Sequence, residues 1–200
     1  MKMSADHGLS QRAYTSLKLD LIEGRIASGR INIGQLADRY GMSATPVREA
    51  MLRLVGEALL DMPVTGGFEI PSLDENAARH LYILSQYVML TAASCRSSLL
   101  VSHDFNQQDE LGAPPPIELL FDSISQVTQN VFFMHLVRNL NDRMRRIRRA
   151  EERKLSGLRR EFDALLGKIE RGNRQSIRRS VVAYHRRRIR NLPEIMSGLT

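Results

Sequence analysis

The most informative pattern in this 200-residue chain is residues 31–71, INIGQLADRYGMSATPVREAMLRLVGEALLDMPVTGGFEIP. A short amphipathic segment over residues 33–40 ends at Gly41, and glycine commonly ends helices. Ser43-Ala-Thr-Pro46 is typical of a helix start, because it offers two hydroxyl caps and puts proline where a missing N–H costs nothing. We therefore predict two helices joined by a tight turn, the second running to about Glu57.

The segments on either side complete a small domain. Apolar residues at helical spacing predict a helix over residues 11–26. After the helix pair, residues 59–62 and 68–70 are expected to form short strands around a turn at residues 63–67. Two helices joined by a glycine turn, followed by a hairpin, predict a winged helix-turn-helix. Its second helix would enter the DNA major groove, and its hairpin would lie against the backbone or minor groove.

The rest of the chain is predicted to be helical after a linker at residues 71–74. Five segments carry apolar residues at helical spacing and are joined by polar stretches, one of which spans residues 102–116. These segments are residues 75–101, 117–128, 130–153, 157–171 and 174–197. Such amphipathic helices predict an antiparallel bundle. The fold is therefore expected to be mainly α, with a winged helix-turn-helix domain at 1–74 and a helical bundle at 75–200.

Composition narrows the class of protein. An apolar content of 42% excludes a disordered chain, and no apolar run is long enough to predict a membrane-spanning helix. The start, MKMSADHGLSQR, lacks the apolar core of a signal peptide, and the single cysteine, Cys95, suits a reducing compartment. We therefore expect a cytoplasmic protein that does not associate with membranes.

The formal charge of +7 is unevenly distributed along the chain. Residues 1–74 carry 8 basic and 9 acidic side chains, whereas residues 75–200 carry 21 basic and 13 acidic ones. A basic protein invites a nucleic-acid partner. Here, however, the surplus lies outside the winged domain.

Residues 31–71 resemble the GntR family of bacterial transcription regulators. The resemblance rests on Leu36-Ala37, on Gly41, on the run TPVREA at residues 45–50, and on Gly66-Gly67 in the expected wing. It implies a domain that reads double-stranded DNA.

The second half resembles the FCD effector domain of the FadR subgroup. The matching segments are residues 76–82, 121–149, 161–173 and 184–189. Together the two resemblances imply a sequence-specific transcription regulator, such as a repressor, rather than an enzyme. They imply a homodimer at the bacterial nucleoid that binds a palindromic operator and responds to a small-molecule effector.

Arg48 is the leading candidate for contacting DNA bases. Its neighbours Val47, Ala50 and Met51 lie on the apolar stripe, so Arg48 should face outward, where a guanidinium can bind guanine O6 and N7. A solvated surface arginine is the alternative. The other candidate DNA-binding residues are Ser43 and Thr45, as helix caps or phosphate ligands, Gly66 and Gly67 in the wing, and the cations Arg39 and Arg53.

Several positions depart from the family pattern. Gly34 and Ala44 stand where the family commonly has arginine, and Thr65 stands where a basic residue is common near the wing tip. Fewer cations mean fewer phosphate contacts. Either the DNA site is read weakly, or other side chains compensate, with Arg12, Lys18, Arg39 and Arg53 as candidates.

The resemblance also raises the question of a metal ion. FCD domains often hold a divalent ion through one Asp and three His, and the matching positions here are Glu118, Asp122, Phe162 and either Tyr184 or His185. Phe162 cannot ligate a metal, so we predict no metal or other cofactor. Binding through Glu118, Asp122 and His185 is the alternative. Otherwise His185 is expected to be a core histidine bonded to Asp122 or water. The candidate effector-binding residues are Asp122, Arg143, His185 and Glu118.

The arginine runs at residues 143–149 and 186–190 allow a second hypothesis. Residues 138–190 contain 19 basic and 6 acidic groups, so local pairing with Glu151, Glu152 and Glu161 cannot neutralise them. A solvated helix face is the simplest interpretation. The alternative function is a basic RNA- or nucleoid-associated scaffold with a vestigial winged domain.

Overall fold

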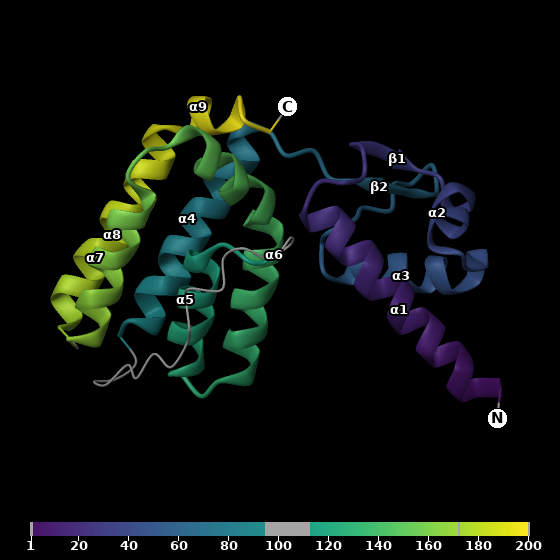
Figure 1. The fold of residues 1–200 in the computed structure, drawn as a ribbon, viewed down its shortest axis with the longest axis horizontal. Coiled ribbons are helices and arrows are strands. Elements are labelled where there is room, and N and C mark those ends of the chain that lie inside the picture. Colours follow the sequence, from purple (N-terminus) through teal and green to yellow (C-terminus); the bar gives the residue numbers. More distant parts are fainter. Residues whose placement is uncertain (1, 95–112, 172, 200) are drawn as a thin grey trace. The chain divides into compact units, whose positions relative to one another are not determined.

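The computed structural model describes residues 2–94, 113–171 and 173–199. The chain forms two compact units, Met1–Ser72 and Leu73–Thr200 (Figure 1). Each unit has its own apolar core. Across the described ranges, no helix combines the length and apolar character needed to cross a membrane.

The first unit contains three helices and a small sheet. Its elements in chain order are α1 (Lys2–Ile22), β1 (Gly29–Ile31), α2 (Ile33–Tyr40), α3 (Ala44–Gly56) and β2 (Phe68–Ile70). The Asn32 side chain caps α2 by accepting from the Gln35 N–H, and Gly41 ends α2 in the left-handed conformation at φ 62°. The apolar faces of α1, α2 and α3 meet in a core that includes Leu17, Leu36 and Met51.

The sheet of this unit differs from the predicted hairpin. Residues 59–62 form no strand, and only Asp61 bridges to Glu69. Leu59 and Leu60 are both buried, which breaks the in–out alternation of a half-exposed strand. The partner of β2 is instead β1, which pairs with it antiparallel and places Gly29 opposite Ile70.

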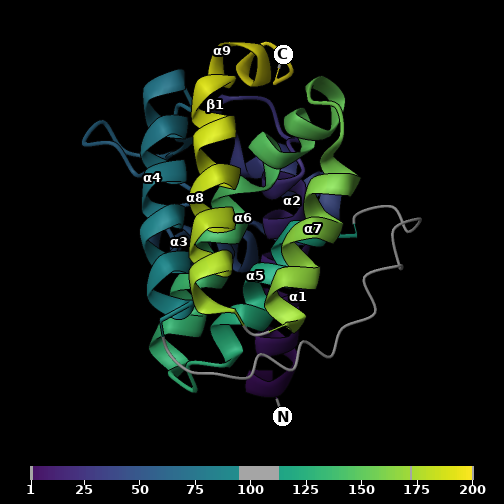
Figure 2. The same cartoon turned by 90° about the vertical axis from the view of Figure 1, so that its left-hand side faces the viewer.

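The second unit is an antiparallel helical bundle, as predicted. Its elements are α4 (Glu75–Ala92), α5 (Pro116–Gln126), α6 (Val131–Lys154), α7 (Leu158–Glu170), α8 (Arg174–Arg190) and α9 (Leu192–Met196). In Figure 2, α4, α8 and α7 lie side by side. Side-chain caps from Asp74, Asn130 and Asn173 begin α4, α6 and α8.

Three predicted helix boundaries are corrected. In the first unit, the helix expected over residues 11–26 instead runs from Lys2 to Ile22. The segment expected as one helix over residues 174–197 is broken at Asn191, whose side chain donates to the Arg187 carbonyl at 2.7 Å. Pro193 follows in the first turn of α9, where its missing N–H costs nothing. The helix expected over residues 75–101 ends at Ala92, and Cys95 lies outside the described residues.

Candidate functional site

The outer face of α3 presents an arginine with no partner. Val47, Ala50 and Met51 are buried in the core, whereas Arg48 is exposed, as the helical spacing predicts. Among the described residues, Arg48 forms neither a hydrogen bond nor an ion pair. Its guanidinium donors are therefore available for an external acceptor such as a base edge.

The start of α3 is not capped by its own hydroxyls. Ser43 occupies the cap position in extended conformation, but its side chain makes no cap hydrogen bond. Thr45 lies inside the first turn, because the helix begins at Ala44. The prediction of capping was therefore wrong for Ser43. Both hydroxyls are exposed at the start of α3, where an α-helix leaves its first N–H groups without a partner inside the helix. Such a helix start suits a phosphate.

Arg39 and Arg53 are held against α1. Arg39 pairs with Asp20 at 2.9 Å. Arg53 lies over the Tyr14 ring, 3.8 Å from its centroid, and donates to Gln11. Both are less available for DNA than Arg48, since each already has an intramolecular partner.

The turn before β2 contains an arginine that the sequence interpretation missed. Gly66 and Gly67 have φ values of 78° and 85°, a region that favours glycine. The Arg30 side chain, from β1, donates to the carbonyls of Thr65 at 3.3 Å and Gly66 at 2.6 Å. A cation thus stands at the wing turn although Thr65 is uncharged. The position of Arg30 depends on the pairing of β1 with β2, which the sequence did not predict.

The four predicted effector residues do not form one site. Glu118 is buried and pairs with Arg145 at 2.7 Å and Arg148 at 3.2 Å. Asp122 accepts from Asn141 at 2.9 Å. Arg143 is exposed on α6. Glu118 and its two arginines therefore join α5 to α6 inside the bundle.

His185 is a core histidine, but its partners differ from those expected. Its Nδ1 lies 2.7 Å from the Val181 carbonyl and its Nε2 lies 3.0 Å from the Ser85 hydroxyl, so both ring nitrogens have partners other than Asp122. A carbonyl can only accept, so Nδ1 carries the proton and Nε2 accepts from Ser85. Burial lowers the pKa of His185 to about 3, which keeps the ring neutral.

The residues at the family's metal positions do not fit a metal ion. Phe162 is a buried core side chain, Glu118 is bridged by two arginines, and both nitrogens of His185 are hydrogen-bonded. A divalent ion needs three or four free N, O or S ligands. We therefore derive no role for a metal from these positions.

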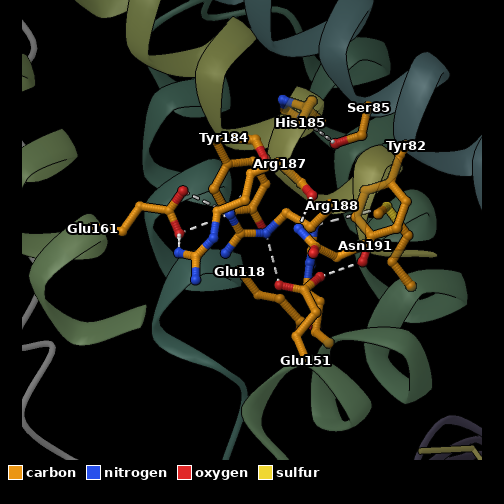
Figure 3. A network of polar contacts seen from close by, with 12 residues as sticks. Tyr82, Ser85, Glu118, Glu151, Glu161, Tyr184, His185, Arg187, Arg188 and Asn191 are labelled. Atoms are coloured by element: carbon orange, nitrogen blue, oxygen red, sulfur yellow. Dashed lines mark hydrogen bonds and ion pairs between the residues drawn. The ribbon is translucent and has the colours of Figure 1, made fainter. Parts of the chain in front are cut away.

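The arginine runs of the second unit are only partly a solvated face. Arg145, Arg148 and Arg188 are buried, which contradicts the simplest interpretation of these runs. Figure 3 shows Arg188 between two carboxylates, at 2.8 Å from Glu151 and 2.7 Å from Glu161. Its guanidinium also lies 3.5 Å from the Tyr184 ring centroid. These pairs cross between helices, so spacing along one helix does not reveal them.

A cavity of about 420 Å³ lies next to this network. Its polar wall includes Arg148, Glu151, Glu161, Tyr184 and Arg188, and apolar side chains from α5 and α7 supply much of the remainder. None of the four predicted effector residues lines it. The cavity is thus displaced from the site that the sequence interpretation assigned.

Two buried donors in this cavity wall are unsatisfied. Among the described residues, the Tyr184 hydroxyl and Arg148 Nε have no hydrogen-bond partner. Burial raises the pKa of Tyr184 to about 12, so its hydroxyl keeps its proton. A buried group left unpaired costs about 1–3 kcal/mol, which an acceptor bound in the cavity would offset.

Comparison with known proteins identifies the first unit. Residues 9–70 match the family of bacterial regulatory proteins named gntR. The HTH-type transcriptional regulator McbR of Escherichia coli is 30% identical over 104 residues, which cover 52% of this chain and 47% of that protein. The HTH-type transcriptional regulator BphR of Paraburkholderia xenovorans, itself uncharacterized, is 31% identical over 93 residues, 46% of this chain and 37% of the relative. The matched segment thus spans less than half of each relative.

Solved structures share the fold of the whole chain. A GntR regulator from Rhodococcus sp. RHA1 superposes with a TM-score of 0.73 at 14% identity, covering 92% of this chain and 97% of that one. McbR of E. coli gives 0.66 at 21% identity with the same coverage. The fold is therefore a winged helix-turn-helix followed by a helical bundle, which confirms the predicted fold class. The family match covers residues 9–70, less than half of the chain, and is to bacterial regulatory proteins.

Proposed function

We propose that this protein is a sequence-specific, DNA-binding transcription regulator of the bacterial cytoplasm. One observation carries the proposal: a GntR-family α3 presents Arg48 to solvent, and Arg48 has no partner among the residues that the structure describes. In the major groove, an arginine at this position would discriminate guanine by about 1–3 kcal/mol. The exposed hydroxyls of Ser43 and Thr45 would bind phosphate at the start of the same helix.

The wing supports the same function. Arg30 supplies a cation at the turn where Gly66 and Gly67 keep the backbone free of side chains. We assign this turn to the DNA backbone or minor groove, as in other winged domains.

The second unit is proposed to be an FCD-type dimerisation and effector domain. Large apolar side chains are exposed on α4 in one stripe, with Ile83, Leu84 and the 64% exposed Tyr87 at helical spacing. Exposed apolar side chains in such a stripe are what a helix shared with a second copy would show. A dimer would place two α3 helices on the half-sites of a palindromic operator, about one helical turn apart.

The cavity beside Tyr184 is the proposed effector site. Its unsatisfied donors, the Tyr184 hydroxyl and Arg148 Nε, call for a ligand with hydrogen-bond acceptors on a largely apolar body. Such a ligand would regulate DNA binding only if it binds two arrangements of the protein with different affinity.

The experiment starts from duplexes selected from random DNA by the full chain. Binding is then titrated for the original chain and for Arg48→Ala. We expect at least a tenfold loss of affinity for the selected duplex and a small change for a scrambled one. The control is Arg25→Ala, which removes an equal charge from an arginine paired with Asp20 in the same unit. Equal losses for Arg48→Ala and Arg25→Ala would contradict the proposal.

A further inference from the structure

The outer face of α8 carries four arginines. Arg178, Arg179, Arg186 and Arg190 are exposed, and their spacing places them on one side of the helix, opposite the buried Val181, Tyr184 and Arg188. We call these four residues the α8 arginine stripe. From Arg178 to Arg190 the stripe is about 18 Å long, at 1.5 Å per residue.

No carboxylate is paired with the stripe in the described part of the chain. Of the helices that contact α8, α7 and α9 carry acidic residues, but none of these forms an ion pair with a stripe arginine. The sequence of α8 contains no Asp or Glu, and neither does the half of α4 packed beside it, residues 83–92. Among the described residues, Arg179, Arg186 and Arg190 make no ion pair or hydrogen bond. Arg178 donates to Ser94 at 2.8 Å and to the Leu90 carbonyl at 3.4 Å, both of them uncharged partners.

Two other arginines of α8 are neutralised by carboxylates. Arg187 and Arg188 turn toward α7 and α6 and pair with Glu161 and Glu151. The stripe arginines therefore differ from Arg187 and Arg188 in lacking a carboxylate partner among the described residues. Four uncompensated charges on one rigid face lower the local potential energy of an anion, most strongly at low salt.

The surface beside the stripe is also hollowed. A shallow groove of about 410 Å³ runs between α8 and the carboxyl end of α4, and Arg178, Arg179 and Arg186 line it together with Leu90. Over about 18 Å, one strand of duplex DNA presents about five phosphates. A phosphate backbone therefore fits both the length and the charge of this face.

We propose that the α8 arginine stripe is a second nucleic-acid contact, which binds the phosphate backbone of duplex DNA without reading its sequence. The stripe lacks the exposed amide or aromatic side chains that read or stack on bases, apart from Gln175. Its contribution is the release of counterions. The inference goes beyond the proposed function, because it assigns DNA affinity to the second unit.

The test measures binding of the full chain to a duplex of arbitrary sequence across a salt series. For Arg179→Gln/Arg186→Gln we expect about threefold to tenfold weaker binding near 50 mM salt. We also expect the slope of log K against log salt to fall by about 1 to 2, because each phosphate contact contributes about 0.9.

The matched control is Arg146→Gln/Arg160→Gln on α6 and α7. It removes the same charge from two arginines that have no ion pair or hydrogen bond in the described part of the chain. The control should bind the arbitrary duplex like the original chain. An unchanged slope in the stripe variant, or an equal change in the control, would overturn the proposal. The proposal would also be overturned if the stripe variant lost affinity for single-stranded RNA but not for the duplex, because RNA would then be the molecule that the stripe binds.

Failure of this inference can be told from failure of the proposed function. Arg48→Ala tests the preference for selected over scrambled DNA, whereas the stripe variant should weaken both duplexes equally and leave their ratio unchanged. If only Arg179→Gln/Arg186→Gln leaves duplex binding unchanged, the second DNA contact is wrong, and the proposed function as a regulator is unaffected. If only Arg48→Ala is silent, the base-reading role of α3 is wrong.

Discussion

Arg48 on α3 and Arg188 on α8 lie in opposite environments. On α3, Arg48 is exposed and has no partner among the described residues, in a unit with equal numbers of acidic and basic side chains. On α8, Arg188 is 3% exposed and lies between Glu151 and Glu161. The difference shows that the number of arginines does not locate a binding surface. What matters is whether each guanidinium already has a carboxylate, and only the tertiary structure shows that.

The largest expected effect is the loss of stability when the buried Arg188 is replaced. Arg188→Ala leaves Glu151 buried without its cation and should lower the free energy of unfolding by about 3–5 kcal/mol. Urea unfolding followed by circular dichroism measures this. Arg186→Ala, on the exposed side of the same helix, should change the stability by less than about 0.5 kcal/mol. Similar losses for the two variants would mean that the Arg188 network is not holding the bundle.

The buried His185, which lies near Arg148 and Arg188, makes the stability of the second unit depend on pH. In the folded chain its pKa is lowered to about 3, mainly by burial and also by Arg148 and Arg188, whereas an unfolded chain has a value near 6.5. Between these values the unfolded state binds more protons. The stability contributed by the neutral ring is therefore complete above about pH 6.5 and is lost as the pH falls toward 3, by up to about 1.4 kcal/mol per unit.

The measurement is the unfolding free energy between pH 7 and 5 for the original chain and for His185→Asn. The variant should show a flatter decline, since it has no ring to protonate. His135→Asn, at an exposed position, should decline like the original chain. If His185→Asn declines as steeply as the original chain, His185 is not protonated on unfolding in this range.

The smallest effect concerns the unsatisfied hydroxyl beside Arg188. Tyr184→Phe removes a buried donor that has no partner in the described part of the chain, so the unliganded protein should gain stability, by about 1 kcal/mol. Thermal unfolding checks this. A compound that stabilises the original chain through the proposed effector cavity should stabilise Tyr184→Phe less. A clear loss of stability in the unliganded variant would show that the hydroxyl is already satisfied.

The sequence predicted the first unit well where a motif and helical periodicity agree. The apolar spacing of Val47, Ala50 and Met51 was enough to place Arg48 outside. The spacing could not predict β1, because Gly29–Ile31 is too short to show an alternation, and with β1 the position of Arg30 was missed.

The polar interior of the second unit could not be predicted from spacing along one helix. Glu118 and Asp122 looked like ligand residues, but Glu118 is paired with Arg145 and Arg148 of another helix. Similarly, His185 takes its hydrogen bond from Ser85, which lies 100 positions away in the chain. These contacts depend on how α4, α5, α6 and α8 pack against one another. The spacing of residues within one helix does not predict that packing.

The most direct test of the central claim is the ratio of affinities for selected and scrambled duplexes at one salt concentration. The claim is that Arg48 reads DNA sequence. Arg48→Ala should lower this ratio at least tenfold, while Arg25→Ala and Arg179→Gln/Arg186→Gln leave it unchanged. A ratio that survives Arg48→Ala would contradict the claim.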